Sequence, residues 1–146
     1  MVTIDFDVSV ARPAEEVFEY LADPQKVVQW QAWAVDIEQV SEEARGVGAR
    51  FRDVRRFLGR TIESTMEFTE YEPPKVLGLK VESGPIPFRI RQTLEAEGAG
   101  TRVRVHAEGE PGGFFKLAEP LVGRAAERQM KSDFETLKDL LETGHG

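Results

Sequence analysis

Polar and apolar residues alternate at the start of the chain, over residues 3–10, and this pattern predicts a half-buried strand. The spacing becomes helical after Pro13, a residue that suits the first turn of a helix. Asp23 and Pro24 interrupt this pattern and favour the start of a second short helix. Two helical pieces are therefore expected within residues 13–31, directly after the first strand.

Between Val35 and Glu110 the period of the pattern returns to two, which is typical of strands. Glycine and proline residues divide this segment at positions that suit turns. Because the connections are short, we expect consecutive strands to pair in an antiparallel meander. The six expected strands cover residues 35–42, 48–57, 60–71, 75–83, 86–97 and 101–110.

The last part of the chain carries one long helical pattern, which follows Gly112-Gly113 and ends near Glu142. Pro120 lies within it and marks either the first turn or a kink. A seven-stranded sheet must cover its apolar face, and only this helix is large enough to do so. We therefore predict an α+β fold, with a curved antiparallel sheet around the C-terminal helix and a cavity between them. The apolar stripe of the helix is expected to comprise Leu117, Leu121, Ala125, Met130, Phe134, Leu137 and Leu141.

Composition narrows the functional classes. The 146 residues suit a single domain spanning residues 1–146, and the absence of cysteine excludes disulfides and thiolate chemistry. With two histidines, we expect neither a metal site nor a cofactor. A net charge of −7 argues against nucleic acid as the partner. The lack of a long apolar run or a leader segment predicts a cytoplasmic protein without a membrane span. We expect the protein to be either a monomer or a weak homodimer.

Alternation assigns the apolar side of each strand to the concave face of the sheet. Trp30 and Phe115 are expected near the entrance of the cavity, with Trp30 a better candidate than Trp33 for lining it. Phe115 either serves as a gate or packs as a staple at the start of the helix. Outside the cavity, His106 falls on the outer face with no acid expected beside it, and we assign it no role. The expected lining residues are Phe51, Ile62, Ser64, Met66, Phe68, Leu79, Phe88, Ile90, Gln92 and Val105, with Leu121 from the helix.

Asp53 and Arg55 share the concave face with these apolar residues. If Leu58-Gly59 closes a two-residue hairpin, Asp53 lies opposite Ser64 and Arg55 opposite Ile62. A charge in the protein interior is costly unless it is paired. Three interpretations stay open: a structural ion pair, a bulge that turns Arg55 outward, or an arginine that donates hydrogen bonds to a ligand carbonyl or carboxylate.

The order of strand, two short helices, six strands and a long helix resembles the helix-grip fold of the START/Bet v 1-like (SRPBCC) superfamily. Local stretches are similar to its bacterial polyketide cyclase/dehydrase and lipid-transport branch. The resemblance implies that a hydrophobic small molecule, lipid or polyketide-like, binds between the sheet and the C-terminal helix. The stretches that carry it are Ala11–Phe18, Gly46–Phe51, Tyr71–Pro74, Gly100–Val103 and Leu137–Glu142.

Three functions compete at this point. The mostly apolar inner face favours a non-catalytic carrier or sensor of a hydrophobic molecule. The alternative is a cyclase, aromatase or dehydratase acting on a polyketide-like carbonyl compound, for which Arg55 and Ser64 match the residue types of the family's cyclases. Against this alternative, no tyrosine or histidine falls on the inner face, so acid–base chemistry would rest on Asp53 alone. A protein-interaction module would need an exposed apolar patch, which the outer face does not show.

Overall fold

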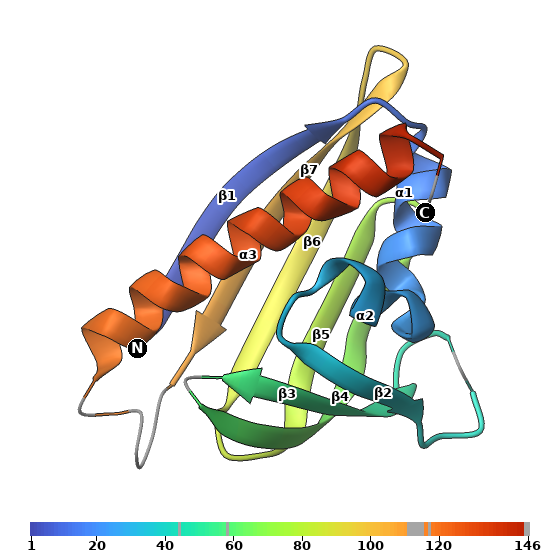
Figure 1. Cartoon of the computed structure of the whole chain (residues 1–146). Coiled ribbons are helices and arrows are strands. Elements are labelled where there is room, and N and C mark those ends of the chain that lie inside the picture. The colour runs from blue at the N-terminus through green and yellow to red at the C-terminus, as the bar shows by residue number, and fades with distance from the viewer. Residues whose placement is uncertain (44, 58, 111–115, 117, 145–146) are drawn as a thin grey trace.

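The alternating segments form one antiparallel sheet with the strand order β1-β7-β6-β5-β4-β3-β2, and the sheet curves around a long helix (Figure 1). The structure is a computed structural model that describes residues 1–43, 45–57, 59–110, 116 and 118–144. The helical segments are α1 (Ala14–Ala22), the 3-10 helix η1 (Pro24–Lys26), α2 (Val27–Trp30) and α3 (Glu119–Glu142). The strands are β1 (Val2–Val10), β2 (Ala34–Gln39), β3 (Arg50–Phe57), β4 (Arg60–Glu72), β5 (Val76–Ser83), β6 (Phe88–Glu97) and β7 (Gly100–Gly109).

The predicted α+β helix-grip architecture is confirmed. Strands β2 to β7 follow one another as a meander, and β1 joins the far edge by pairing with β7, where Phe6 lies opposite Val105. The two-residue hairpin register between β3 and β4 is also as predicted, because Asp53 pairs with Ser64 and Arg55 with Ile62. Leu58 itself lies outside the described residues.

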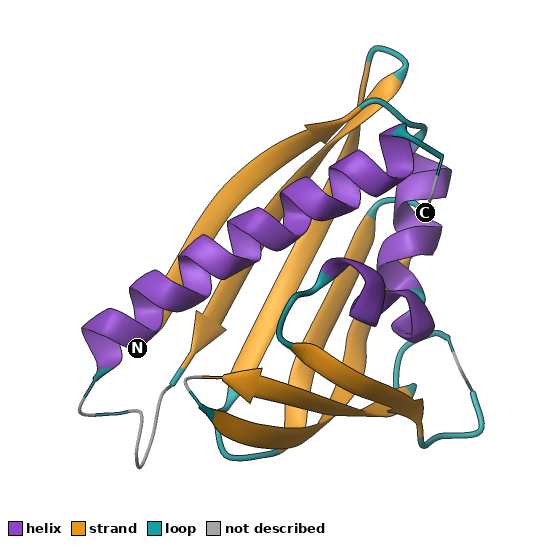
Figure 2. Ribbon diagram, viewed as in Figure 1, coloured by secondary structure: helices purple, strands orange, loops and turns teal. Residues whose placement is uncertain are grey.

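Helix α3 lies along β1 and crosses the concave side of the sheet (Figure 2). It begins at Glu119, with Pro120 in its first turn, where a missing backbone N–H costs no helical hydrogen bond. The expected residues Leu117 and Phe115 lie outside the described residues. The helix is held at its other end by β1 and the segment after it, because the Ala11 N–H donates to Glu142 at 2.8 Å.

The predicted position of Leu121 on the buried stripe is wrong, because its side chain is 66% exposed. Phe134 and Leu137 are almost fully buried, with exposures of 2% and 0%. Leu121 precedes Phe134 by about three and a half turns at 3.6 residues per turn, which places it on the opposite side of the helix. The neighbouring Val122, 5% exposed, takes the inward position instead.

Two separate apolar clusters join α3 to the sheet. Towards its C-terminal end, Phe134 and Leu137 belong to the main core, which continues into β1, β3, β4 and β7. Towards its N-terminal end, Val122 packs with Phe57 in a smaller cluster that also includes Trp33. Between these two clusters a cavity separates α3 from strands β3 to β6.

The outer face of the sheet is a solvated, ion-paired surface, as predicted. Arg52, for example, contacts Asp36, Glu38 and Glu63 at 3.1 Å in each case. The expectation that His106 has no acid near it is wrong: its ring nitrogens contact Asp5 and Glu108. Hydrogen bonds to Glu108 and Asp5 raise the pKa of His106 above its ordinary value. Over the described residues, no helix is both long enough and apolar enough to cross a membrane.

Leu137 is buried and Leu121 is exposed on α3, so replacing each by alanine should lower the free energy of unfolding by different amounts. Leu137→Ala removes a fully buried side chain and should lower the free energy of unfolding by about 2–5 kcal/mol. Leu121→Ala, on the exposed side, should change it by less than about 0.5 kcal/mol. Urea unfolding followed by circular dichroism measures both, and similar losses in the two variants would contradict this orientation of the helix.

Candidate functional site

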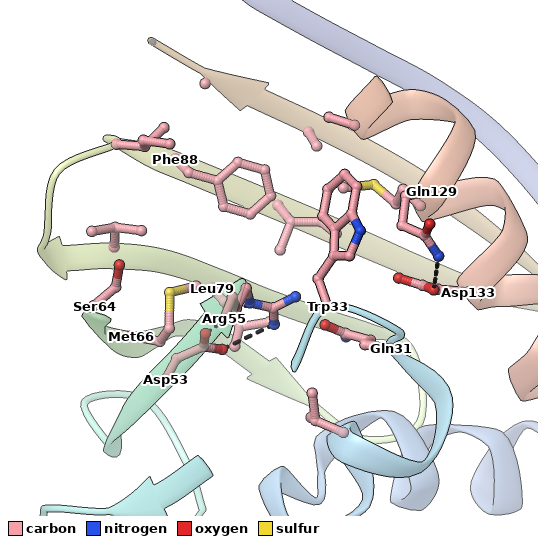
Figure 3. Close-up of a pocket in the computed structure, with 18 of the residues that line it drawn as sticks. Gln31, Trp33, Asp53, Arg55, Ser64, Met66, Leu79, Phe88, Gln129 and Asp133 are labelled. Carbon is pink, nitrogen blue, oxygen red and sulfur yellow. Dashed lines mark hydrogen bonds and ion pairs between the residues drawn. The ribbon is translucent and has the colours of Figure 1, made fainter. Parts of the chain in front are cut away.

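A cavity of about 250 Å³ lies between the concave face of the sheet, α3, and the segment around α2. Most of the side chains around it are apolar, and Figure 3 shows Met66, Leu79 and Phe88 among them. At the packing density of protein interiors, this volume accommodates a ligand of roughly a dozen non-hydrogen atoms. Eleven of the residues expected to line a cavity do line it: Trp30, Phe51, Arg55, Ile62, Ser64, Met66, Phe68, Leu79, Phe88, Ile90 and Gln92.

Two of the expected lining residues, Val105 and Leu121, are not at the cavity. Leu121 faces away from it on the exposed side of α3. Val105, 2% exposed, is packed in the main core, where Phe134 lies against Phe6, the strand partner of Val105, at 5.4 Å between ring centroids. Ala107, two residues further along β7, reaches the cavity instead. Phe115 lies outside the described residues.

Asp53 and Arg55 form a bidentate ion pair on the cavity side of β3. The Arg55 Nε donates to Asp53 Oδ1 at 2.7 Å, and Nη2 donates to Oδ2 at 2.9 Å (Figure 3). The Asp53 side chain is 5% exposed and that of Arg55 30%. Arg55 therefore points inward, and an outward turn of this side chain at a bulge is excluded. Both carboxylate oxygens are bound within the pair, so its charges compensate each other.

The two tryptophans contribute differently to the cavity. Trp30 is 4% exposed and its ring contacts Phe134 edge-on, with 5.0 Å between centroids. Its Nε1 is buried and finds no hydrogen-bond partner among the described residues. The rings of Trp33 and Phe57 are in contact, with 4.6 Å between their centroids. The indole of Trp33 projects among the lining side chains (Figure 3). The preference for Trp30 over Trp33 in the sequence interpretation is therefore not supported, because both tryptophans line the cavity.

Asp133 on α3 is a charged lining residue that the sequence analysis did not assign to the cavity. Its side chain is buried, and its Oδ1 accepts hydrogen bonds from Gln129 Nε2 at 2.7 Å and from the Ala32 N–H at 3.1 Å. Burial raises the pKa of this carboxyl, while those two hydrogen bonds and the positive charge of Arg55 oppose the rise. Acid–base chemistry in the cavity is therefore not limited to Asp53.

Asp133 could have been found from the helical pattern. It lies three residues after Met130 and four before Leu137, so an ionisable residue occupies the buried stripe of an amphipathic helix. Gln129 lies one turn before it on the same side. A charged residue inside an apolar stripe is unusual for a purely structural helix, because its burial is costly.

The cavity thus has a polar end and an apolar remainder. Asp133, Gln129, Gln31, Trp33 and Arg55 come from three segments of the chain and face the same space (Figure 3). Neither tyrosine nor histidine occurs among the described lining residues. No group of three histidine or acidic side chains that suits a metal ion is found in the described part of the chain. The arrangement suits a largely apolar molecule with a polar group at one end.

A curved seven-stranded antiparallel sheet around a C-terminal helix, with short helices after the first strand, defines a protein of the Bet v 1-like helix-grip fold. The sequence matches the family of polyketide cyclases/dehydrases and lipid-transport proteins over residues 1–142. The chain belongs to this family. Among curated proteins, none matches the sequence significantly.

Solved structures share the fold at low sequence identity. The protein TTHA0849 from Thermus thermophilus superposes with a TM-score of 0.85 at 19% identity, with 99% of each chain covered. Ara h 8.0201 gives a TM-score of 0.75 at 14% identity over 97% of each chain. The di-domain ARO/CYC StfQ from the steffimycin biosynthetic pathway gives 0.73 at 17% identity, over 95% of this chain and 44% of StfQ. These similarities establish the architecture.

The Asp53–Arg55 pair predicts strong coupling between two substitutions. Arg55→Met leaves a buried carboxylate without its partner and should lower the free energy of unfolding by about 3–5 kcal/mol. Adding Asp53→Leu removes that carboxylate and should restore most of the loss. Denaturant unfolding of the wild type, both single variants and the double variant gives the coupling energy. Additive losses would show that the two side chains do not depend on each other.

The buried carboxyl of Asp133 predicts a pH-dependent stability. Its pKa is raised from the ordinary 3.8, so the folded state binds the proton more tightly than the unfolded state. Stability is therefore lost as the pH rises from the unfolded pKa through the folded pKa. Asp133→Asn removes this loss and should raise the melting temperature at pH 7, with a smaller gain at pH 4.

The control for that variant is Asp139→Asn, which makes the same change at an exposed position of the same helix. It should leave the melting temperature nearly unchanged across this pH range. A lower melting temperature for Asp133→Asn than for the wild type at pH 7 would contradict the assignment.

Proposed function

We propose that this protein binds a hydrophobic small molecule, lipid or polyketide-like, in the cavity between sheet and helix, and carries or senses it. The observation that supports the proposal is the cavity itself, about 250 Å³ in size and lined mainly by apolar side chains from both the sheet and α3. Transfer of an apolar molecule from water into such a space is favourable because apolar surface is removed from water on both sides.

The ion pair supports a carrier more than a catalyst. Arg55 already directs Nε and Nη2 to Asp53, so one of the two bidentate edges of the guanidinium is occupied and its positive charge is matched before a ligand arrives. Asp53 in turn is held by both of its oxygens. The pair therefore neutralises itself within an apolar surrounding, and a ligand meets it as a compensated polar group.

The second candidate function is a cyclase, aromatase or dehydratase acting on a carbonyl compound. One observation favours it: Asp133, a buried carboxyl with a raised pKa, shares the cavity with Arg55. A carboxyl with a raised pKa keeps its proton to a higher pH than an ordinary aspartate, which suits a general acid. The family combines cyclases, dehydrases and lipid transport, and it is compatible with either function.

The carrier proposal predicts that a neutral solvatochromic dye binds and that its emission shifts to the blue. Ala126→Phe places a large side chain from α3 into the cavity and should weaken dye binding at least about tenfold. Ala96→Phe makes the same substitution at an exposed position of β6 and serves as the control. Fluorescence titration measures both, and circular dichroism verifies that the variants fold.

Two results would oppose the carrier proposal. The first is a wild-type protein that binds no apolar probe, which would remove the basis of both candidate functions. The second is a stable Arg55→Met variant that selectively loses carbonyl-bearing ligands while it retains hydrocarbon ligands. That selective loss would favour the enzyme.

A further inference from the structure

Asp133 differs from the other acidic groups at the cavity because only one of its two carboxylate oxygens is hydrogen-bonded to the described residues. Its Oδ1 is held by Gln129 and the Ala32 N–H, but no hydrogen bond from the described residues reaches its Oδ2. Asp53, in contrast, has both oxygens bound by Arg55. The side chain of Asp133 is therefore fixed in orientation through one oxygen and has the other available to a molecule in the cavity.

The negative charge of the Asp133 carboxylate is not matched by a cation of its own among the described lining residues. Arg55 faces it from β3, but that guanidinium is already paired with Asp53. Glu108 of β7 also lines the cavity, and it pairs with His106 and Arg89 on the outer side of the sheet. Within the described lining, Asp133 is thus the carboxyl whose charge is not matched by a dedicated cation.

We propose that Asp133 selects ligands by their head group, so that the cavity prefers hydrophobic molecules with a hydroxyl group over those with an anionic group. This inference rests on the proposed ligand-binding function. A ligand hydroxyl donates a hydrogen bond to the open Oδ2, a contact to an ionised acceptor that is stronger than one between neutral groups. An anionic head group at the same place meets a like charge in a surrounding of low dielectric constant.

The raised pKa of Asp133 adds a pH dependence in one direction. Once the carboxyl is protonated, it no longer repels an anion and can donate a hydrogen bond to it. Affinity for an anionic ligand is therefore expected to increase as the pH falls through the pKa of Asp133. The neighbouring Asp53 and Glu108 are paired with cations, so Asp133 is the group that changes the charge of the polar end.

Three probes with one ring system separate the head group from the apolar body: 2-methylnaphthalene, 2-naphthol and naphthalene-2-sulfonate. Their dissociation constants are measured by displacement of the neutral dye at pH 7.5. In the wild type, 2-naphthol should bind at least about tenfold more tightly than the sulfonate, a ratio typical of one charge-assisted hydrogen bond. In Asp133→Asn the ratio should fall at least about fivefold, because the amide NH2 can donate to the sulfonate and the amide is uncharged.

Two controls accompany this experiment. Asp139→Asn carries the same change of charge on the exposed side of α3 and should keep the wild-type ratio. The affinity for 2-methylnaphthalene should be the same in all three proteins, since it has no head group. If Asp133→Asn does not fold, the wild type alone decides: sulfonate affinity should increase between pH 7.5 and pH 5 while 2-methylnaphthalene affinity stays constant.

The outcomes separate the two proposals. If none of the three probes binds, the ligand-binding function fails and this inference fails with it. If 2-methylnaphthalene binds but the ratio of naphthol to sulfonate is near one, or is unchanged in Asp133→Asn, the head-group inference alone is overturned. A sulfonate affinity that is independent of pH in the wild type would overturn it as well.

Discussion

A rod-like helix cannot follow a strongly curved sheet along its whole length, and the rest of this structure depends on that mismatch. Helix α3 runs along the edge strand β1 and packs into the two apolar clusters through Phe134 and Leu137 at one end and through Val122 at the other. Close packing normally fills the space between layers, because empty volume forfeits dispersion contacts. Here the curvature holds the layers apart between the two contacts, and the unfilled volume is the cavity.

The polar groups at the cavity show two solutions to the cost of burying charge. Asp53 is compensated by a guanidinium two residues away on the same strand, so its charge is matched before any ligand arrives. Asp133 is held by an amide and a backbone N–H, which orient it without neutralising it. The first arrangement offsets the cost of burying a carboxylate, whereas the second leaves binding capacity directed at the cavity.

The sheet was more predictable from the sequence than the site. Alternation and a two-residue turn determine both the inner face and the pairing of Asp53 with Ser64, since a strand has only two faces. A helix offers a continuous range of directions, so Leu121 was assigned to the wrong side and Asp133 was overlooked. Two acids lie beside His106, and only one of them was beyond local reasoning. Asp5 reaches it through the β1–β7 pairing, which no local turn specifies, whereas Glu108 lies two residues away on the same face of β7 and follows from the alternation.

That pairing also sets the order of events during synthesis. Val2 lies opposite Gly109 and Val10 opposite Thr101, so β1 meets its strand neighbour β7 about a hundred residues after it has been made. At roughly 5–20 residues per second, the ribosome needs about 5 to 20 s to supply β7. During this interval β1 has an unpaired edge, which is the usual starting point of aggregation. Asp5 and Asp7 interrupt the apolar residues of β1, and charges placed in this way disfavour pairing with another chain.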